Sequence, residues 1–314
     1  MTVLLTGASG FVGQAVMFFF TERGLATRPV YRTAAQTGVA AGAVVVPSLD
    51  ADTDWSAALQ GVEVVLHAAA RAHIMRDEAL DPLAEYRRVN VAGTLNLARQ
   101  AAAAGVRRFV FVSSIKVNGE STQPGRPFTA DDAPAPEDAY GMSKAEAEAG
   151  LWEMARATGM ELVIVRPVLV YGPGVKGNLA SMMRWVRRGV PLPLGAVTGN
   201  RRSLVALENL VDFLAVCAVH PKAANQVFLA SDGEGVSTAG LLQLMAMAAQ
   251  RPTQLLSVPV VLLQWGARVL GKQAVAQRLL GSLQVDIQKN RDVLGWQPPV
   301  SAQAAWQKMK DEGL

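Results

Sequence analysis

The sequence predicts an α/β fold of the Rossmann type, a doubly wound parallel sheet, followed by a smaller α/β domain. Strand-like and helix-like segments alternate through the first half of the 314 residues. The strand-like runs, such as Val-Val-Val and Phe-Val-Phe-Val, are apolar throughout, as expected for strands covered by helices on both faces. A glycine-rich turn joins the first strand to the first helix, which is typical of this fold.

Each element of the first half is assigned from its apolar spacing. Helical segments of ten or more residues between strands imply right-handed crossovers, and therefore parallel strands. The expected strands are Val3–Leu5, Thr27–Arg32, Ala43–Pro47, Val62–His67, Arg108–Ser113 and Leu162–Arg166, and the expected helices are Gly10–Arg23, Ala57–Leu59, Pro82–Ala104 and Tyr140–Gly159.

The sequence pattern changes after Arg166, where turn-rich stretches separate short helices. We expect one late strand, Gln226–Ala230, to return to the sheet, and a helical region from Thr238 to about Gly271. The pattern predicts a first domain over residues 1–165 and a second over 166–314.

The composition restricts the class of ligand. Charged residues make up 18% of the chain, the net charge is +4, and aromatic residues make up 6%. The basic residues occur in short pairs, Arg107-Arg108, Arg187-Arg188 and Arg201-Arg202, which favours an anionic small molecule over a nucleic acid.

Cys217 is the single cysteine, so neither an internal disulfide nor a cysteine-based metal site is expected, and we predict a buried, inert thiol. No signal peptide is visible. Val258–Leu270 is too short to span a membrane and predicts an amphipathic or buried helix. These features favour a cytoplasmic protein without stable membrane insertion and without a metal.

Gly7, Gly10 and Gly13 lie between the first strand and the first helix. Glycines at this spacing allow a tight turn, close approach to a pyrophosphate and close packing of helix on strand. The helix N-terminus attracts the phosphates. The turn therefore predicts a dinucleotide cofactor.

The end of the second strand normally distinguishes the two nicotinamide cofactors. Arg32 stands there without a neighbouring carboxylate, which favours a 2′-phosphate and hence NADP over NAD. Asp50, after the third strand, is placed to accept from the adenine amino group. His67 ends the fourth strand in an apolar run, so we expect a buried, hydrogen-bonded histidine without a catalytic role.

Tyr140 and Lys144 lie four residues apart, on one face of the same expected helix. An ammonium beside a phenol favours the phenolate, so Tyr140 is a candidate acid/base for a sugar or alcohol hydroxyl. Ser113-Ser114 ends the strand that precedes this helix and supplies a candidate hydroxyl.

Together these segments resemble the extended short-chain dehydrogenase/reductase family, over nearly the whole chain. The resemblance rests on Thr6–Gly13, His67–Ala70, Asn90, Ser113-Ser114, Tyr140–Lys144, Arg166-Pro167 and Tyr171–Gly174. Within the family the chain is similar to the nucleotide-sugar 4-epimerases of the UDP-galactose 4-epimerase type and to 4-ketoreductases of bacterial surface-polysaccharide pathways.

The resemblance implies roles by position. Ser114 would bind the sugar C4 oxygen, Tyr140 would be the acid/base, and Lys144 would hold the nicotinamide ribose and tune the phenol. The residues implied for the cofactor are Gly7, Gly10, Phe11, Val12, Gly13, Arg32, Leu49, Asp50, Ala68, Ala69, Ala70, Asn90, Tyr140, Lys144 and Pro167, and those implied for a UDP-sugar are Ser114, Asn178, Arg202 and Arg278.

Two departures from the family pattern bear on the reaction. Residues 115–119 lack the Asp-Glu pair of the related dehydratases, which disfavours a dehydratase. Asn118 replaces a common tyrosine, and Lys116 adds a cation near the site.

An epimerase and a reductase share every residue named here. An epimerase acting on a lipid-diphosphate sugar remains open, in which case Val258–Leu270 could touch a membrane. A non-catalytic dinucleotide-binding protein is the rival from another class. A homodimer is expected from the resemblance.

Overall fold

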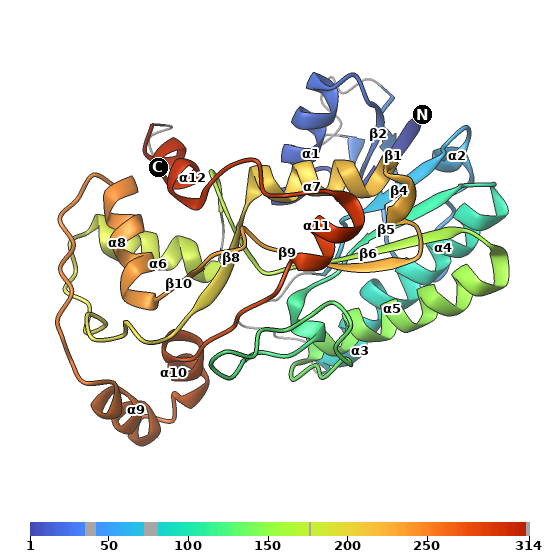
Figure 1. Ribbon diagram of the computed structural model, residues 1–314. Coiled ribbons are helices and arrows are strands. Elements are labelled where there is room, and N and C mark those ends of the chain that lie inside the picture. The colour runs from blue at the N-terminus through green and yellow to red at the C-terminus, as the bar shows by residue number, and fades with distance from the viewer. Residues whose placement is uncertain (35–41, 72–80, 176, 312–314) are drawn as a thin grey trace.

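The computed structural model describes residues 1–34, 42–71, 81–175 and 177–311 and has two lobes (Figure 1). The larger lobe is built on a seven-stranded sheet of order β3-β2-β1-β4-β5-β6-β9, in which every neighbouring pair is parallel. The strands are β1 (Thr2–Thr6), β2 (Ala26–Tyr31), β3 (Val44–Val45), β4 (Val64–His67), β5 (Arg108–Val112), β6 (Glu161–Pro167) and β9 (Gln226–Ala230). This strand order confirms the predicted Rossmann-type fold.

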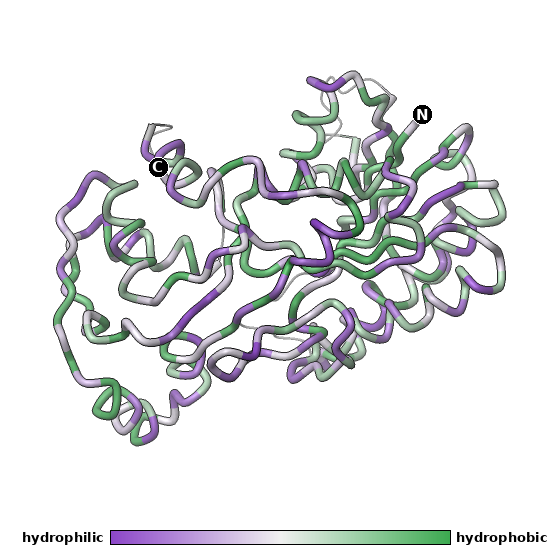
Figure 2. The backbone as a smooth tube through the Cα atoms, viewed as in Figure 1, coloured by the Kyte–Doolittle hydropathy of each residue, from purple (hydrophilic) through white to green (hydrophobic). Residues whose placement is uncertain are grey.

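Helices cover both faces of this sheet (Figure 1). One face carries α1 (Phe11–Glu22) and α7 (Leu207–Val219), which pack against each other. The other carries α2 (Ser56–Leu59), α4 (Thr94–Ala103) and α5 (Ala139–Thr158). Figure 2 shows the central strands as predominantly hydrophobic, as strands covered on both faces must be.

The expected helix over residues 82–104 is present with a wide turn inside it. It consists of α3 (Pro82–Tyr86), a π-helical segment η2 (Arg87–Gly93) and α4. Gly93 lies in this segment, where an added Cβ would approach the Leu49 carbonyl carbon to 2.7 Å. The π turn thus allows the helix to press against the segment that follows β3.

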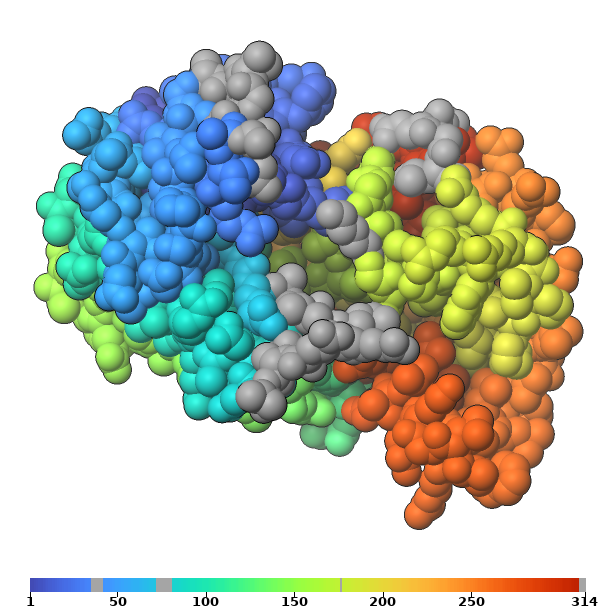
Figure 3. Space-filling view, turned by 180° about the vertical axis from the view of Figure 1, so that it is seen from behind, coloured from blue at the N-terminus to red at the C-terminus, as the bar shows by residue number. Residues whose placement is uncertain are grey.

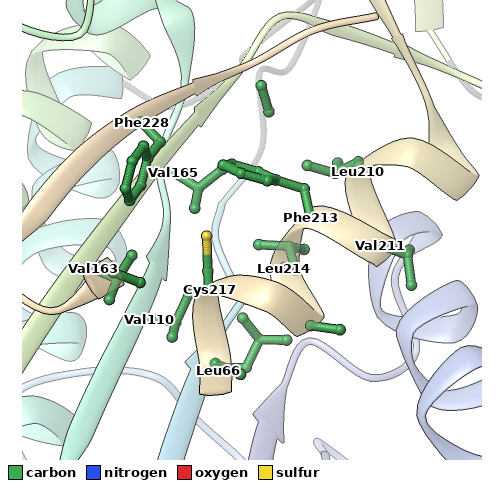
Figure 4. Close-up of a cluster of buried hydrophobic side chains, with 14 of the residues drawn as sticks. Leu66, Val110, Val163, Val165, Leu210, Val211, Phe213, Leu214, Cys217 and Phe228 are labelled. Carbon is green, nitrogen blue, oxygen red and sulfur yellow. The ribbon is translucent and has the colours of Figure 1, made fainter. Parts of the chain in front are cut away.

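The face under α7 is a continuous apolar core (Figure 4). Phe213 and Cys217 point from α7 toward the strands and lie near Val110 and Val165, and all four are fully buried. Burial raises the pKa of the Cys217 thiol. The prediction of a buried cysteine is confirmed.

The smaller lobe contains a second sheet of order β10-β8-β7. Its strands are β7 (Leu169–Tyr171), β8 (Arg202–Ala206) and β10 (Gly235–Val236), and its helices include α6 (Gly177–Arg187), α8 (Thr238–Ala248) and α12 (Ala302–Asp311). Tyr171 stacks on Trp306 with ring centroids 4.7 Å apart, and both are buried in the core of this lobe.

The helical region expected from Thr238 to about Gly271 holds two helices and an interruption. Helix α8 ends at Ala248, and α9 (Val260–Val269) begins after eleven intervening residues that include an extended segment. Pro252 and Pro259 disfavour helix in this segment, and the backbone of Leu256 instead bonds to Leu192 and Gly195. Helix α9 is also not buried, since none of its residues is.

The second half of the chain contributes more to the larger lobe than the one returning strand that was expected. Helix α7 covers the large sheet, and α11 (Gln288–Leu294) packs against β9. The division into domains at residue 165 remains a prediction. In the described residues no helix has both the length and the apolarity needed to cross a membrane.

Arg108 explains one of the basic pairs and corrects its assignment to a ligand. Its side chain is fully buried, donates from Nε to Glu161 at 2.7 Å and donates from Nη1 to the carbonyls of Cys217 and His220 at 2.9 Å. These carbonyls lie at the C-terminal end of α7, where a cation is stabilising. The Arg107-Arg108 pair therefore serves the fold, since Arg107 also pairs with Glu161.

Candidate active site

The glycine turn brings the ends of β1 and β4 and the start of α1 into close contact. Gly7 has φ +75°, and a Cβ there would lie 2.8 Å from the amide nitrogen of Ala69. A Cβ on Gly13 would lie 2.0 Å from the carbonyl oxygen of Gly7. Each position therefore excludes a side chain.

This turn fits the diphosphate of a dinucleotide. Gly10 precedes α1 and offers no capping side chain, so the amides of Phe11, Val12 and Gly13 in the first helical turn are available to an anion. A nicotinamide dinucleotide bound here would place its diphosphate against these backbone donors.

The other residues predicted for the cofactor follow neighbouring strands of the same sheet edge. Ala68–Ala70 follow β4, Leu49 and Asp50 follow β3, and Arg32 directly follows β2 and is exposed. The carboxylate of Asp50 accepts from the Thr53 hydroxyl at 2.8 Å, and this bond is the main cause that lowers its pKa. The carboxyl ends of parallel strands form the ligand-binding edge of such sheets.

Asn90 connects this edge to the catalytic helix. Its buried amide donates to the Ser143 hydroxyl at 3.0 Å and to the Arg71 carbonyl at 3.1 Å, and accepts from the Arg71 amide at 2.8 Å. Ser143 in turn donates to the carbonyl of Tyr140 at 2.8 Å. Asn90 therefore links the backbone at Arg71, which follows β4, to Ser143 on α5. Direct contact of Asn90 with a cofactor remains a prediction.

The two serines after β5 point to different partners. Ser113 is buried and donates to the carboxylate of Glu148. Ser114 caps the short helix η3 (Ile115–Val117), and its hydroxyl lies close enough to Tyr140 to lower the pKa of the phenol. The geometry thus puts Ser114, and not Ser113, beside the candidate acid/base.

Tyr140 lies in the first turn of α5. Asp138 caps this helix by accepting from the Gly141 amide at 2.7 Å. A Cβ on Gly141 would lie 2.8 Å from the carbonyl oxygen of Lys116, so the glycine lets α5 approach η3 closely. This contact explains why a glycine follows the tyrosine and how Ser114 comes within reach of it.

The pKa of the Tyr140 phenol is raised to about 12, chiefly by burial, with further contributions from Asp138 and Tyr86. The hydrogen bond to Ser114 acts in the opposite direction. Lys144 is not among these causes, so the lowering of the phenol pKa by a charged Lys144 stays a prediction. The phenol is neutral at pH 7 and is poised to donate a proton.

Lys144 lies one turn along the same helix and is 1% exposed. Its Nζ is 4.0 Å from the centre of the Phe111 ring. Burial lowers its pKa to about 7, and the nearby carboxylate of Glu148 partly opposes this shift. The lysine therefore changes charge near neutral pH.

A buried polar network beside α5 was not predicted from the sequence. Arg166 pairs with Glu148 at 2.5 Å and donates to the side-chain oxygen of Asn118 at 3.0 Å, while Glu148 also accepts from Ser113. Asn118 is therefore part of this network and is 2% exposed. The four-residue spacing of Lys144 and Glu148 was the available signal.

His67 is fully buried and is hydrogen-bonded to Thr6 at 2.7 Å and to Thr94 at 2.9 Å. Its pKa is lowered to about 3, first by burial and then by the charge of Lys144. The prediction of a neutral, hydrogen-bonded core histidine is confirmed.

Two predicted substrate residues of the smaller lobe converge on the segment after η3. Arg202 is influenced by the charges of Glu120 and Arg278, and burial is the main cause that lowers its pKa. The Nε of Arg278 lies 3.9 Å from Glu120. Lys116 bonds to Glu120 at 2.8 Å and also to Asp138, so its ammonium is held in two ion pairs and is only partly exposed.

The third predicted substrate residue is Asn178, which is exposed in the first turn of α6. Its role remains a prediction. Pro167 ends β6, the strand that also carries Arg166.

Within the described ranges, no three His, Cys, Asp or Glu side chains are grouped so as to hold a metal ion. An open hollow of about 510 Å³ lies in the smaller lobe beside Arg201, Ser237 and Met247, and it does not include Ser114, Tyr140 or Lys144.

Comparison with known proteins agrees with the fold and the motifs. The family described as NAD dependent epimerase/dehydratase matches residues 3–230. The chain is 47% identical to a UDP-glucose 4-epimerase of Vibrio cholerae over 310 residues, which cover 98% of this chain and 94% of that protein.

Solved structures of low sequence identity share the fold. The UDP-glucose 4-epimerase of Thermotoga maritima with UDP-glucose superposes with a TM-score of 0.77 at 22% identity, covering 99% of this chain and 98% of that one. The UDP-glucose 4-epimerase of Thermus thermophilus with NAD gives a TM-score of 0.77 at 22% identity, covering 100% and 99%. The chain belongs to the NAD-dependent epimerase/dehydratase family.

Proposed function

We propose that this enzyme is a nucleotide-sugar 4-epimerase that acts on a UDP-hexose or a UDP-N-acetylhexosamine for surface-polysaccharide synthesis. The observation that carries the proposal is the proximity of the Ser114 hydroxyl to the Tyr140 phenol, whose pKa it lowers, with Lys144 one turn further along α5. A protein that only binds a dinucleotide does not need these three groups together, which argues against the non-catalytic alternative.

The chain's part in the reaction is movement of the proton at the C4 oxygen. Ser114 would hold this oxygen against Tyr140, whose phenolate form takes the proton when C4 is oxidised and whose phenol form returns it when C4 is reduced. The ammonium of Lys144, charged below pH about 7, would stabilise the phenolate form and bind the ribose. A nicotinamide dinucleotide, when bound, would supply the reversible oxidation and reduction at C4.

The substrate would be held by its diphosphate. Arg202 and Arg278 both lie close enough to Glu120 to interact with its charge, and planar guanidinium groups suit phosphate oxygens. A grip on the diphosphate leaves the sugar able to turn and present both faces of C4, which epimerisation requires. Asn178, in the first turn of α6, would add a donor at a helix N-terminus.

The preferred dinucleotide is a separate question. Arg32 directly follows β2 and favours the 2′-phosphate of NADP. The name of the matching family and the bound molecule of the Thermus thermophilus relative favour NAD. An epimerase returns its cofactor to the starting state, so tightly retained NAD would fit it, whereas consumption of NADPH would indicate a 4-ketoreductase, the second candidate.

The deciding experiment is incubation of the purified enzyme with UDP-glucose or UDP-N-acetylglucosamine, without added nucleotide, followed by NMR of the anomeric protons. Conversion to the 4-epimer, together with a dinucleotide released on denaturation, supports an epimerase. No epimer with either sugar, but NADPH oxidation with a 4-keto sugar, would replace it with a reductase. Light scattering on the same sample tests the expected homodimer.

A further inference from the structure

Helix α9 presents an apolar stripe that nothing in the described chain covers. Val261, Leu262, Trp265 and Val269 are 72%, 57%, 67% and 65% exposed. On a helix this spacing puts all four on one face about 100° wide. The opposite face holds the half-buried Leu263 and packs toward α10 (Gln273–Leu280), so the stripe points outward.

The stripe is the outer surface of a projecting unit. Helices α9 and α10 extend from the smaller lobe, away from the large sheet (Figure 1). The space-filling view from behind shows the same segment as a protruding knob (Figure 3). Leu256, Leu270 and Val275 flank the helix and are 55%, 70% and 50% exposed. Contiguous apolar surface of this kind marks an interaction site.

The charge around the stripe selects the kind of partner. No Asp or Glu occurs between Glu234 and Asp286, whereas this stretch contains Arg251, Arg268, Lys272 and Arg278. Arg268 is exposed at the edge of the stripe, and Lys272 lies just beyond the end of the helix. An apolar face bordered only by cations complements an anionic lipid surface.

We propose that α9 docks this enzyme on the surface of an anionic lipid bilayer. Val261, Leu262 and Val269 enter the boundary of the acyl chains, and Trp265 lies at the level of the headgroups, where tryptophan is favoured. Arg268 and Lys272 contact lipid phosphates. The ten-residue helix lies in the plane of the interface, consistent with its being too short to cross.

Docking through α9 would place the lipid surface near the candidate substrate site. The docking itself does not rest on the proposed function. Helix α10 follows α9 after a short turn and carries Arg278, which lies 3.9 Å from Glu120. The lipid surface would therefore lie on the side of the molecule where the substrate diphosphate is expected to enter.

Vesicle co-sedimentation tests the docking, with phosphatidylcholine alone and with an equal mixture of phosphatidylcholine and phosphatidylglycerol. Wild type should bind the mixed vesicles. Leu262→Glu combined with Trp265→Glu should weaken binding at least tenfold, since each buries a charge in place of an apolar side chain. Phe18→Glu is the matched control, because Phe18 is 68% exposed on the far lobe, and it should bind like wild type.

The basic residues are tested separately. Arg268→Gln combined with Lys272→Gln should weaken binding to the mixed vesicles by roughly twenty- to thirtyfold, about fivefold for each charge. It should leave the weak binding to phosphatidylcholine nearly unchanged. Quenching of tryptophan fluorescence by lipids brominated in the acyl chain should be lost in Trp265→Phe.

Three results would overturn the docking: no binding of wild type to the mixed vesicles, equal binding by the Leu262/Trp265 variant, or equal loss in Phe18→Glu. Light scattering without lipid measures the oligomeric state and tests whether a second copy of the chain covers the stripe instead. A dimer that the Leu262/Trp265 variant converts to a monomer would assign the stripe to a second copy of the chain, and would refute the lipid surface. Activity on a soluble nucleotide sugar, measured in parallel, keeps failure of the docking distinct from failure of the proposed function.

Discussion

The hydroxyl of Ser114 lies beside the phenol of Tyr140 and lowers its pKa, against the effect of burial. The adjacent hydroxyl of Ser113 points away and donates to the carboxylate of Glu148, which is itself paired with Arg166. The two neighbouring serines thus have different roles. Ser114 faces the candidate acid/base, whereas Ser113 helps to hold the helix that carries Tyr140.

This division predicts opposite phenotypes for two alanine variants. Ser114→Ala should lower turnover by about a hundredfold, the range for loss of one hydrogen-bond donor at a reacting oxygen, with the melting temperature nearly unchanged. Ser113→Ala should lower the free energy of unfolding by roughly 1–3 kcal/mol, because it leaves a buried carboxylate with one bond fewer. Turnover and thermal unfolding of both variants decide the matter. Reversed phenotypes would exchange the two roles.

Lys144 should make the protein less stable below neutral pH. Its pKa is lowered from 10.5 to about 7 in the folded protein, so between these values the unfolded chain binds one proton more. The contribution of this residue to stability therefore rises with pH from about 7 to 10.5, and the penalty for burying the charge is fully present below pH 7.

Lys144→Met should accordingly raise the melting temperature, with the largest gain at pH 6 and a smaller gain at pH 9, while it abolishes activity. The gain at pH 6 should be roughly 1–3 kcal/mol, less than the full linkage value because the contact with Phe111 changes as well. Lys222→Met is the control, since Lys222 is exposed and should show no such pH trend. A gain that grew with pH would contradict a lysine of lowered pKa.

Arg32 should distinguish the cofactors. If it binds the 2′-phosphate, Arg32→Asp should weaken NADP about ten- to a hundredfold more than NAD, the value of a charge-assisted bidentate pair. Titration of both dinucleotides against both proteins measures this ratio. Equal losses would place Arg32 outside the cofactor site, and NAD would then be the cofactor favoured by the family.

Two neighbouring arginines provide a matched test of the proposal that the substrate is held by its diphosphate. Arg202 is close enough to Glu120 and Arg278 to be influenced by their charges, whereas Arg201 donates to the carbonyls of Thr198 and Asn200. Arg202→Ala should weaken UDP binding by about 1.5–3 kcal/mol, the range for a hydrogen bond to a charged group, and Arg201→Ala should have little effect. Calorimetry with UDP compares them. Absence of UDP binding by wild type would direct the search to another activated sugar.

The sequence was sufficient for the larger lobe because its strands are short apolar runs and its helices carry a strong periodic pattern. Val64–His67 and Arg108–Val112 needed no tertiary information, since covered parallel strands are apolar throughout. The π turn inside residues 82–104 was not predictable, because it depends on the contact of Gly93 with the segment after β3.

The motif residues of the candidate site could be predicted from the sequence, but the buried residues that hold them in place could not. Tyr140, Lys144 and Ser114 followed from spacing and resemblance, whereas the pairing of Glu148 with Arg166 joins a helix to a strand and has no local signature. The raised pKa of Tyr140 was missed for the same reason, since burial depends on how α5 packs against η3. The exposed stripe of α9 fits the amphipathic of the two alternatives predicted for Val258–Leu270, and the sequence could not choose between them because burial depends on tertiary packing.

The most direct test of the account is the turnover of Tyr140→Phe with a UDP-sugar that the wild type epimerises. Removing the hydroxyl should lower turnover by two or more orders of magnitude, the range of lost general acid–base catalysis, and leave dinucleotide binding nearly intact. Tyr86→Phe is the control, because its ring lies 5.9 Å from that of Tyr140 in an edge contact that the substitution preserves. Turnover by Tyr140→Phe equal to that of wild type would contradict the assignment of this tyrosine as the acid/base.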